Sequence, residues 1–487
     1  MLRICFVHTP MCSVQVEGRN KFWYNFDKRY YAVHSALKPT DASIWELPHW
    51  MIWLGGVLKS KGFTDIKTFS LYTAVDILTG LDQAIILKDI QENPSDVYLY
   101  SPMTPNLHLA LEIASLVKFC FPNSINVFGG VIATPQHKQI ASRAEVDIVV
   151  RDRGEIALPE LLKALQGNQP VENVKNLSYK NKTGAIITHS KLYSYLEPKN
   201  IPDPYIELFP KDVGPKLRYI RQNYALGCPF KCSFCTIQTI GRKPNYFPVE
   251  RVLNEIKQFR AHYGEYHNIY FGDETFTVNK EKTKEICSAL RLTGNITYDI
   301  QTRLENLVDK PILLMLSSSG CRWVEVGIET LIQKSMPIHK QNTNLMKVKE
   351  ILFRLRDHGL PVCSFIVNGL PEQTLDEMRY SIDKVCSLLE EGLLHASYFF
   401  GLVPYPGSIM YDKPECYGLK IKHHDYKYYN EELVPVYDTH LATSDEIYKV
   451  FLEGVQKIGQ AMSSQPCLGT PLPVEFIENL GKSLVHV

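Results

Sequence analysis

Three cysteines stand close together in the run CPFKCSFC, at Cys228, Cys232 and Cys235. Thiolates bind soft metals and iron–sulfur clusters, and a compact loop can bring three of them to one centre. A structural zinc site needs a fourth ligand, usually from a second CxxC pair or from two histidines. The nearest histidines, His262 and His267, come well after the run and have no CxxC partner. The CxxxCxxC spacing therefore indicates a [4Fe–4S] cluster that leaves one iron open to another ligand.

The chain contains twelve cysteines in all, and most of the remaining nine are scattered through apolar stretches. The first residues, MLRICFVHTP, lack the long apolar run and the small-residue cleavage site of a secretory signal. The apolar runs elsewhere are too short to cross a bilayer. These features predict a cytoplasmic protein without a membrane span, whose scattered cysteines are thiols packed as small apolar residues.

The charges of the chain are nearly balanced. Its 53 basic and 52 acidic side chains give a formal net charge of +1. Such a chain has no global field to attract nucleic acid or an anionic membrane, so we predict no nucleic-acid partner. At 487 residues it is long enough for two domains plus an appendage.

A series of alternating strands and helices begins just before the cysteines, at residue 219. Its strand-like segments are YIRQNYALG, NIYFGD, YDIQTR, WVEVGIE, CSFIVNGL and ASYFFGLVP. Six parallel strands with helices between them fit a partial (β/α)6 barrel, whose active site lies at the carboxyl ends of the strands. Beyond residue 408 the chain becomes polar and aromatic and then helical, which predicts a small helical C-terminal cap.

The first part of the chain shows the same α/β alternation. Its strand-like segments are RICFVHT, TDIKTFSLY, DVYLYSP, INVFGG and VDIVVRD, and amphipathic segments such as PHWMIWLGGVLKSKGF and LHLALEIASLVKFC separate them. This order predicts a flavodoxin- or Rossmann-like parallel sheet with helices on both faces. Ligands of such sheets bind outside the carboxyl ends of the strands. The loops expected there are Thr9–Pro10, Ser101–Thr104 and Gly129–Thr134.

Two segments depart from the alternation. Residues 11–47 hold a run of aromatic side chains among charges, and they fit either a surface loop with its own small cluster or a lid over a ligand at the strand ends. Val171–Lys216 contains NKTGAIITHS, which fits a hairpin, and then a proline-rich stretch typical of a linker. We therefore expect domains at 1–200, with the insertion at 11–47, at 201–410, and at 411–487.

The cysteine run resembles the signature of the radical S-adenosylmethionine (SAM) superfamily. Phe234 stands at the aromatic position of that signature, which packs near the adenine in the family. Gly272, Asp273 and Glu274 stand where the family has its methionine-amine motif, usually two glycines and an acid. Asp273 replaces the second glycine, and we expect little effect because backbone carbonyls make most of that contact.

The resemblance continues through the later strands and covers roughly residues 215–410. The positions that match strand ends around the ribose and carboxylate of SAM are Gln301, Arg303, Glu325, Gly327 and Glu329. Val367 and Gly369 lie in VNGLP, which matches the loop near the adenine. The resemblance implies a [4Fe–4S] cluster, SAM, and an electron donor such as flavodoxin or ferredoxin. It assigns no catalytic side chain.

The N-terminal part resembles the cobalamin-binding domain of the methylase branch of this superfamily. The resemblance rests on the strand series, on Gly129 and Gly130 after the fourth strand, and on DIVVRDRGE after it. It implies cobalamin contacts at Ser101, Pro102, Met103, Thr104, Gly129, Gly130 and Thr134. Glycine would let the backbone approach the corrin closely, although in a plain flavodoxin-like domain the same glycines only turn the chain.

One motif of some cobalamin enzymes is missing. No Asp-x-His-x-x-Gly run follows the first strand, so we expect no histidine nitrogen on the cobalt. His8 at the end of that strand is then a satisfied polar residue, and His49 or Trp50 could approach the lower face of the corrin.

These features predict a cobalamin-dependent radical SAM enzyme that methylates an unactivated carbon of a small molecule or peptide. One alternative uses the same cofactors for cyclisation, ring contraction or carbon–sulfur bond formation. A transfer-RNA methylthiotransferase would want a second cysteine triad and a basic tail domain, and neither is present. A non-catalytic cobalamin or cluster sensor is a further alternative, and SAM cleavage under reducing conditions separates it from an enzyme.

Overall fold

The first parallel sheet occupies the N-terminal part of the chain in this computed structural model, which describes residues 2–34, 44–70, 75–76, 80–191, 196–239, 241, 243–265, 268–340 and 344–463. Its strand order is β3-β1-β5-β6-β7-β8-β9. These strands are β3 (Ile66–Ser70), β1 (Ile4–His8), β5 (Val97–Tyr100), β6 (Ile125–Phe128), β7 (Ile148–Val150), β8 (Leu177–Lys180) and β9 (Ile186–Thr188). The pairs from β3 to β7 are parallel, whereas β8 and β9 add an antiparallel hairpin, as NKTGAIITHS predicts.

The order of the parallel strands identifies the fold of this sheet. Numbered along the chain, and leaving aside the two-residue strands β2 (Cys12–Ser13) and β4 (Val75–Asp76), they follow the order 2-1-3-4-5 of flavodoxin-like sheets. The order in which the strands are added to the sheet reverses between β1 and β5. Ligands of such folds bind at the carboxyl ends of the strands, beside this switch point. The helices around the sheet are α2 (His49–Ser60), α3 (Gln83–Glu92), α4 (Leu107–Cys120), α5 (Gly130–Ala133), α6 (His137–Ala141) and α7 (Gly154–Gln166). Both faces are covered, which explains why strands such as ICFVH are continuously apolar.

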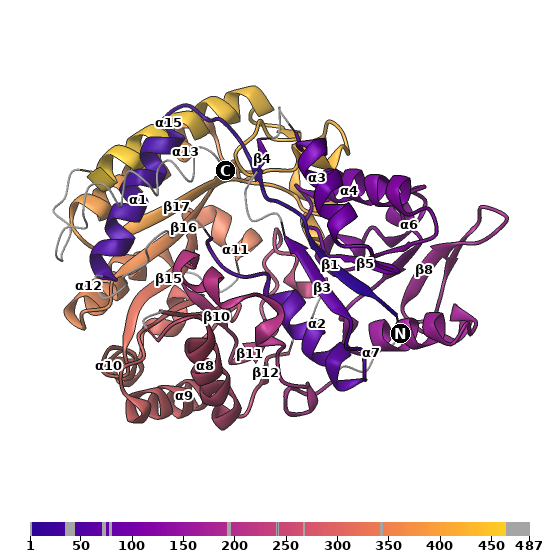
Figure 1. Ribbon diagram of the computed structural model, residues 1–487. Coiled ribbons are helices and arrows are strands. Elements are labelled where there is room, and N and C mark those ends of the chain that lie inside the picture. The colour runs from indigo at the N-terminus through magenta and orange to yellow at the C-terminus, as the bar shows by residue number, and fades with distance from the viewer. Residues whose placement is uncertain are drawn as a thin grey trace.

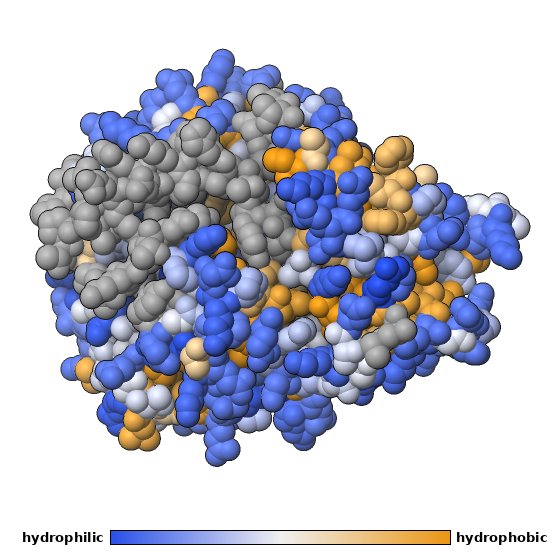
Figure 2. Space-filling view, in the orientation of Figure 1, coloured by the Kyte–Doolittle hydropathy of each residue, from blue (hydrophilic) through white to orange (hydrophobic). Residues whose placement is uncertain are grey.

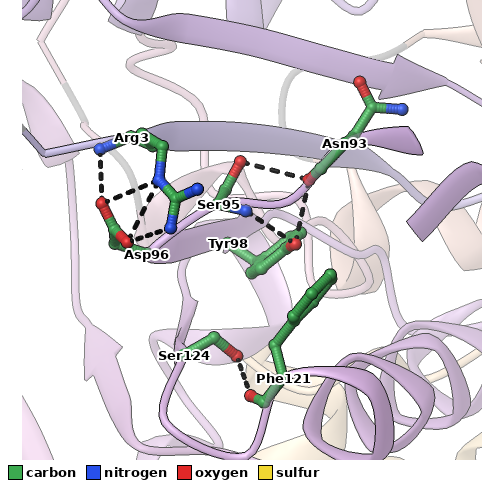
Figure 3. Close-up of polar contacts among 7 residues, drawn as sticks. All are labelled: Arg3, Asn93, Ser95, Asp96, Tyr98, Phe121 and Ser124. Carbon is green, nitrogen blue, oxygen red and sulfur yellow. Dashed lines mark hydrogen bonds and ion pairs between the residues drawn. The ribbon is translucent and has the colours of Figure 1, made fainter. Parts of the chain in front are cut away.

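The opposite, amino edge of this sheet is closed by polar contacts (Figure 3). Arg3 pairs with Asp96 at 2.7 Å, directly before β1 and β5 begin. The Tyr98 hydroxyl accepts from the Ser95 N–H and donates to the Asn93 carbonyl. The turns at this edge join α3 to β5 and α4 to β6, whereas the large cavity lies at the carboxyl edge.

The second parallel sheet has the order β10-β13-β14-β15-β16-β17. Its strands are β10 (Ile220–Gln222), β13 (Ile269–Phe271), β14 (Tyr298–Arg303), β15 (Cys321–Glu329), β16 (Val362–Asn368) and β17 (Ala396–Gly401). All neighbours are parallel, which confirms the partial barrel. The helices that follow its strands are α8 (Val249–Tyr263), α9 (Lys280–Thr293), α10 (Lys310–Ser318), α11 (Met336–His339), α12 (Val348–Asp357) and α13 (Leu375–Glu390).

The expected single strand YIRQNYALG is wrong, because it is divided in two. β10 ends at Gln222, and β11 (Ala225–Leu226) pairs antiparallel with β12 (Asn245–Tyr246). The Asp273 carboxylate accepts from the backbone N–H groups of Tyr224 and Ala225, at 2.9 and 2.6 Å. These donors therefore leave the ladder, and the chain turns into the cysteine loop.

The described part of the aromatic insertion, residues 11–34 and 44–47, contains a buried helix and is not a surface loop. Residues Arg19–Val33 form α1, whose Phe22 and Phe26 are fully buried. In Figure 1 this indigo helix lies beside the yellow α15 (Ser444–Ser463), against the second sheet. This six-stranded sheet is open, with β10 and β17 at its edges. α1 packs against β17, and Ile44 forms a parallel bridge to Leu217, just before β10.

The C-terminal segment joins the outer layer of the barrel. It contains α14 (Ile409–Asp412), the strand pair β18 (Leu419–Ile421) and β19 (Tyr437–Thr439), and α15. α15 packs on α13, α1 and β17, so it covers the outside of the sheet. The segment also reaches the carboxyl end of β16, where Asn368 donates to the Ile447 carbonyl and Tyr437 donates to the Gly369 carbonyl. The last part of the expected cap, residues 464–487, lies outside the described residues.

No helix in the described ranges is long and apolar enough to cross a membrane. Figure 2 shows one face of the molecule, on which hydrophilic residues predominate and apolar residues gather mainly over the half that holds the first sheet.

Candidate active site

The cysteine loop follows β11 at the carboxyl edge of the barrel. Cys228 is buried, and Cys232 and Cys235 are half-buried. Burial, and less strongly the neighbouring thiols of Cys232 and Cys228, raise the pKa of Cys235 to about 12, so the three sulfurs influence one another. Across the described residues, no three potential ligands converge on the position of a single ion. A four-iron cluster would hold each thiolate on a different iron, and Cys228, Cys232 and Cys235 are the thiols that this loop offers to it.

The strand end that matches the methionine-amine motif braces the cysteine loop. Glu274 accepts from the N–H of Gly227, the residue before Cys228, at 3.0 Å. Asp273 turns away from the loop edge and holds the backbone of Tyr224 and Ala225. Burial raises the pKa of Asp273 to about 8, against the two N–H donors, which favour its carboxylate. Asp273, which stands in place of the family's second glycine, therefore has a structural role of its own. The sequence did not indicate this role.

Gly272 has no side chain because an arginine lies across it. A Cβ atom there would stand 2.5 Å from Nε and Nη2 of Arg221. Arg221 donates from Nη2 to the Gly272 carbonyl at 3.3 Å and pairs through Nη1 with Glu46 at 3.0 Å. Arg221 and Glu46 both line the large cavity described below. Sequence reasoning missed both residues, and the only signal for Arg221 was a charge inside a strand.

Arg303 is the strand-end residue that reaches the cysteine loop. Its Nη1 lies 3.7 Å from Sγ of Cys232, and its guanidinium carbon lies 4.1 Å from the centre of the Phe230 ring. Nε donates to Glu305 at 3.3 Å. The structure therefore brings Arg303 next to the proposed cluster, as the sequence predicts for a SAM contact. Phe234, on the same loop, is half-buried and packs against the core.

Gln301 and Glu325 lie one layer deeper than predicted. Glu325 accepts from the hydroxyls of Tyr270 at 2.9 Å and Tyr398 at 3.2 Å, and Gln301 accepts from Tyr270 at 3.3 Å. Burial raises the pKa of Glu325 to about 7. Both residues sit in the middle of their strands, so tyrosines reach them from the neighbouring strands. Their predicted contact with SAM stays a prediction.

The ends of β15 and β16 are held by interactions of their own. Lys340 donates to the Gly327 carbonyl and lies 3.4 Å from Oε1 of Glu329. A Cβ on Gly327 would stand 2.2 Å from that oxygen. Gly369 has a φ of +92° and its carbonyl accepts from the Tyr437 hydroxyl at 2.7 Å, whereas Val367 is only half-buried.

A cavity of about 1340 Å³ joins the carboxyl edges of the two sheets. It exceeds the roughly 300–1,000 Å³ of pockets for drug-sized ligands. The barrel contributes Arg221, Gly272 and Glu274 to its wall, and the N-terminal sheet contributes the ends of β1, β5, β6 and β7. The predicted cobalamin contacts that line it are Ser101, Pro102, Met103, Gly129, Gly130 and Thr134, whereas Thr104 is buried directly behind them.

The loop after β5 is held in place by a buried asparagine. Asn106 accepts from the Met103 N–H at 2.8 Å and donates to the Pro10 carbonyl at 3.1 Å. It thereby ties the loops after β1 and β5, on the two sides of the switch point. Thr134 similarly accepts from the Asp152 N–H at 2.8 Å and joins the loops after β6 and β7.

The two glycines after β6 differ in why they are glycines. Gly130 has a φ of +87°, and a Cβ there would stand 2.3 Å from Oγ of Ser101. Gly129 has an extended backbone, and its Cβ would make only an ordinary contact of 3.5 Å with the Val150 carbonyl. The fold itself thus requires Gly130, which supports the alternative that this glycine turns the chain. Gly129 is free of that requirement.

Two histidines also line the cavity. Burial lowers the pKa of His8 to about 4 and that of His49 to about 3, so both rings are neutral at pH 7. The ring of His49 packs edge-on against Trp53 at 5.1 Å.

Comparisons with known proteins agree with this geometry. The model of the Radical SAM superfamily matches residues 223–385. An anaerobic magnesium-protoporphyrin IX monomethyl ester cyclase of Cereibacter sphaeroides is 26% identical over 68% of this chain, and the match spans 55% of that protein. An uncharacterized methyltransferase of Pyrococcus horikoshii is 25% identical over 77% of this chain and 82% of its own length.

Solved structures match over both sheets. TsrM from Kitasatospora setae, with cobalamin and a [4Fe–4S] cluster bound, gives a TM-score of 0.63 at 13% identity, over 93% of this chain and 82% of that chain. The cobalamin-dependent radical enzyme OxsB, with aqua-cobalamin bound, gives 0.65 at 15% identity, over 92% and 65%. Residues 223–385 therefore match the Radical SAM superfamily, and the chain shares its fold with cobalamin-bound TsrM and OxsB.

Proposed function

We propose that the chain is a cobalamin-dependent radical SAM methyltransferase that acts on an unactivated carbon of a small molecule or peptide. The observation that carries this proposal is the single cavity whose wall combines Gly272 and Glu274 of the barrel with Ser101 and Gly129 of the N-terminal sheet. A methyl carrier and a hydrogen-abstracting centre must both reach one substrate carbon, and a shared cavity permits this.

The residues proposed for the cluster and SAM have separate tasks. Cys228, Cys232 and Cys235 would hold three irons, and Arg303 lies close enough to Cys232 to place positive charge beside that thiolate. Glu274 presents a carboxylate to the cavity, suited to an ammonium group. When bound, the cluster and SAM supply hydrogen-atom abstraction and cobalamin supplies the methyl carrier. The protein orients these groups and keeps water away.

The residues proposed for cobalamin form a wall with little side-chain bulk. Gly129 and Ser101 expose backbone to the cavity, while the aromatic rings of Trp50 and Trp53 line it from α2. Cobalamin-bound TsrM and OxsB share this fold, which supports the assignment. Neutral His8 and His49 border the same space, and we keep the prediction that neither nitrogen binds cobalt.

A second candidate uses the same cofactors for oxidative cyclisation. It is supported by the matches to anaerobic magnesium-protoporphyrin IX monomethyl ester cyclases of Cereibacter sphaeroides and Rubrivivax gelatinosus. Product mass separates the two candidates, because methylation adds one methyl group and releases S-adenosylhomocysteine, whereas cyclisation removes hydrogen.

The test measures both products of SAM under anaerobic, reducing conditions. We expect the reconstituted protein to release 5′-deoxyadenosine with or without cobalamin, and S-adenosylhomocysteine only when cobalamin is bound. Release of neither product from protein that carries its full iron would contradict an enzymatic role and favour the sensor. S-adenosylhomocysteine formed without cobalamin would remove cobalamin from the proposal.

We also propose a flavodoxin- or ferredoxin-type electron donor and a cytoplasmic location. The location is supported by the free thiols of the described cysteines. Reduction of the cluster by purified flavodoxin, followed by paramagnetic resonance, tests the donor.

A further inference from the structure

Ser233 lies between two of the proposed cluster ligands and is held on three sides. Its N–H donates to the His339 carbonyl at 3.1 Å, and its carbonyl accepts from the Met410 N–H at 3.0 Å. Its hydroxyl lies 2.7 Å from Nδ1 of His339. Ser233 is 2% exposed, whereas Pro229 and Lys231 of the same loop are exposed. The cysteine loop is thus anchored at its centre.

His339 passes this anchor on to a carboxylate. It ends α11, is 2% exposed, and its Nε2 lies 2.6 Å from Oε2 of Glu372. An ionised carboxylate only accepts hydrogen bonds, so Nε2 donates. In the neutral ring Nδ1 is then the acceptor for the Ser233 hydroxyl. The Tyr417 ring stacks on the imidazole with centroids 5.8 Å apart, which fixes the plane of the ring.

The relay joins loops that belong to different parts of the site. Glu372 directly follows Pro371, at the end of the segment predicted to lie near the adenine. His339 precedes Lys340, which donates to the Gly327 carbonyl at the end of β15. These hydrogen bonds, together with the peptide bond between His339 and Lys340, therefore connect the cysteine loop with two loops expected around SAM.

We propose that Ser233, His339 and Glu372 set the position of the cluster loop relative to the SAM loops, with His339 as the positioning residue. This inference rests on the proposed cluster ligands. Apart from the relay and Met410, the backbone contacts of the loop include Cys228 N–H to Gly241 at 3.3 Å and the internal turn from Cys235 N–H to Cys232 at 3.2 Å. Loss of the His339 side chain therefore leaves Ser233, at the centre of the loop, held only by its two backbone hydrogen bonds among the contacts named above.

The experiment compares three variants at His339 after anaerobic reconstitution. His339→Ala removes both hydrogen bonds. The side-chain amide of Asn reaches about as far as Nδ1, and that of Gln about as far as Nε2, so His339→Asn keeps the Ser233 contact and His339→Gln keeps the Glu372 contact. For His339→Ala we expect iron release to a chelator to be about tenfold faster, because the buried Ser233 hydroxyl loses its side-chain partner. We also expect a shifted cluster midpoint potential and a weaker change in its paramagnetic spectrum when SAM is added. His339→Asn should restore iron retention, because it keeps the contact with the loop itself.

The control is His262→Ala, which removes a ring on the outer helix α8. Nε2 of this ring lies 3.1 Å from the Phe209 carbonyl. The substitution should leave all three measurements unchanged. If His339→Ala does not fold, Ser233→Ala and Glu372→Ala each cut one link and give the same readouts. Wild-type iron release, potential and SAM response in His339→Ala would overturn the relay. A wild-type protein that takes up no cluster would instead overturn the proposed function.

Discussion

At the carboxyl edge of the barrel, charged and histidine side chains hold the cysteine loop in place, whereas at the carboxyl edge of the N-terminal sheet neutral side chains hold loops that face a large cavity. Asp273, Glu274 and His339 each spend their polar atoms on the chain around the cysteines. Around Gly129 and Ser101, by contrast, the loops are tied by the side chains of Asn106 and Thr134 and face a large cavity. A reactive cluster needs fixed ligands, while a bulky cofactor needs room, and the two edges reflect these demands.

The largest expected effect comes from removing a proposed cluster ligand at the carboxyl edge of the barrel. Replacing Cys228, Cys232 or Cys235 by alanine should abolish the cluster absorption and leave the fold intact, because the apolar core of the barrel is separate. Iron and sulfide analysis measures this against about four of each per wild-type chain. Cys287→Ala and Cys321→Ala are matched controls in the core. A full cluster in any of the three ligand variants would sink the assignment.

The next effect concerns SAM at the same edge. Glu274→Gln and Arg303→Met should each weaken SAM binding about tenfold to a hundredfold, because each removes a charge-assisted contact. Equilibrium binding to the reconstituted protein measures this. Iron content must be measured in parallel, since Arg303 also contacts Cys232 and Glu274 supports Gly227. Unchanged affinity with full iron would mean that SAM lies elsewhere.

Substitutions at Gly129 and Gly130 test whether cobalamin binds at the carboxyl edge of the N-terminal sheet. Gly129→Val should fold, because its Cβ meets only an ordinary contact, and its methyl groups should enter the cavity and reduce cobalamin binding at least tenfold. Gly130→Val should lower stability as well, since its backbone has positive φ and Ser101 is in the way. Cobalamin absorbance after gel filtration and thermal unfolding of the cofactor-free protein separate these effects. Normal cobalamin binding by Gly129→Val would place the corrin away from β6.

The smallest effect is a pH dependence of stability at the carboxyl edge of the N-terminal sheet. Unfolded histidine protonates near pH 6.5, whereas His8 and His49 protonate only near pH 4 and 3 in the folded chain. Their stabilising contribution is therefore complete above pH 6.5 and is lost as the pH falls towards 4. At pH 5.5 the loss is on the order of 1 kcal/mol for each ring. Urea unfolding at pH 7.5 and 5.5 should show a smaller drop for cofactor-free His49→Phe than for wild type. An equal drop would show that this ring is not neutral in the fold.

Much of this architecture was predictable because its signals are local. Period, turn residues and cysteine spacing predict both sheets, the hairpin and the cluster loop, since each depends on neighbours in sequence. The burial of α1 was not predictable, because its aromatic residues face Trp323 and Tyr398 of distant strands. The braces formed by Asp273 and His339, and the depth of Glu325, likewise depend on contacts between remote segments.

The position of α1 has a consequence for how the chain is made. Arg19 pairs with Glu432, 413 positions later, and Arg29 donates to the Met462 carbonyl. During synthesis the first helix therefore cannot dock until almost all of the described chain has left the ribosome. Contacts of such long sequence separation slow folding and prolong the exposure of apolar surface. Removal of either α1 or α15 would therefore take away a helix that packs against β17 of the barrel.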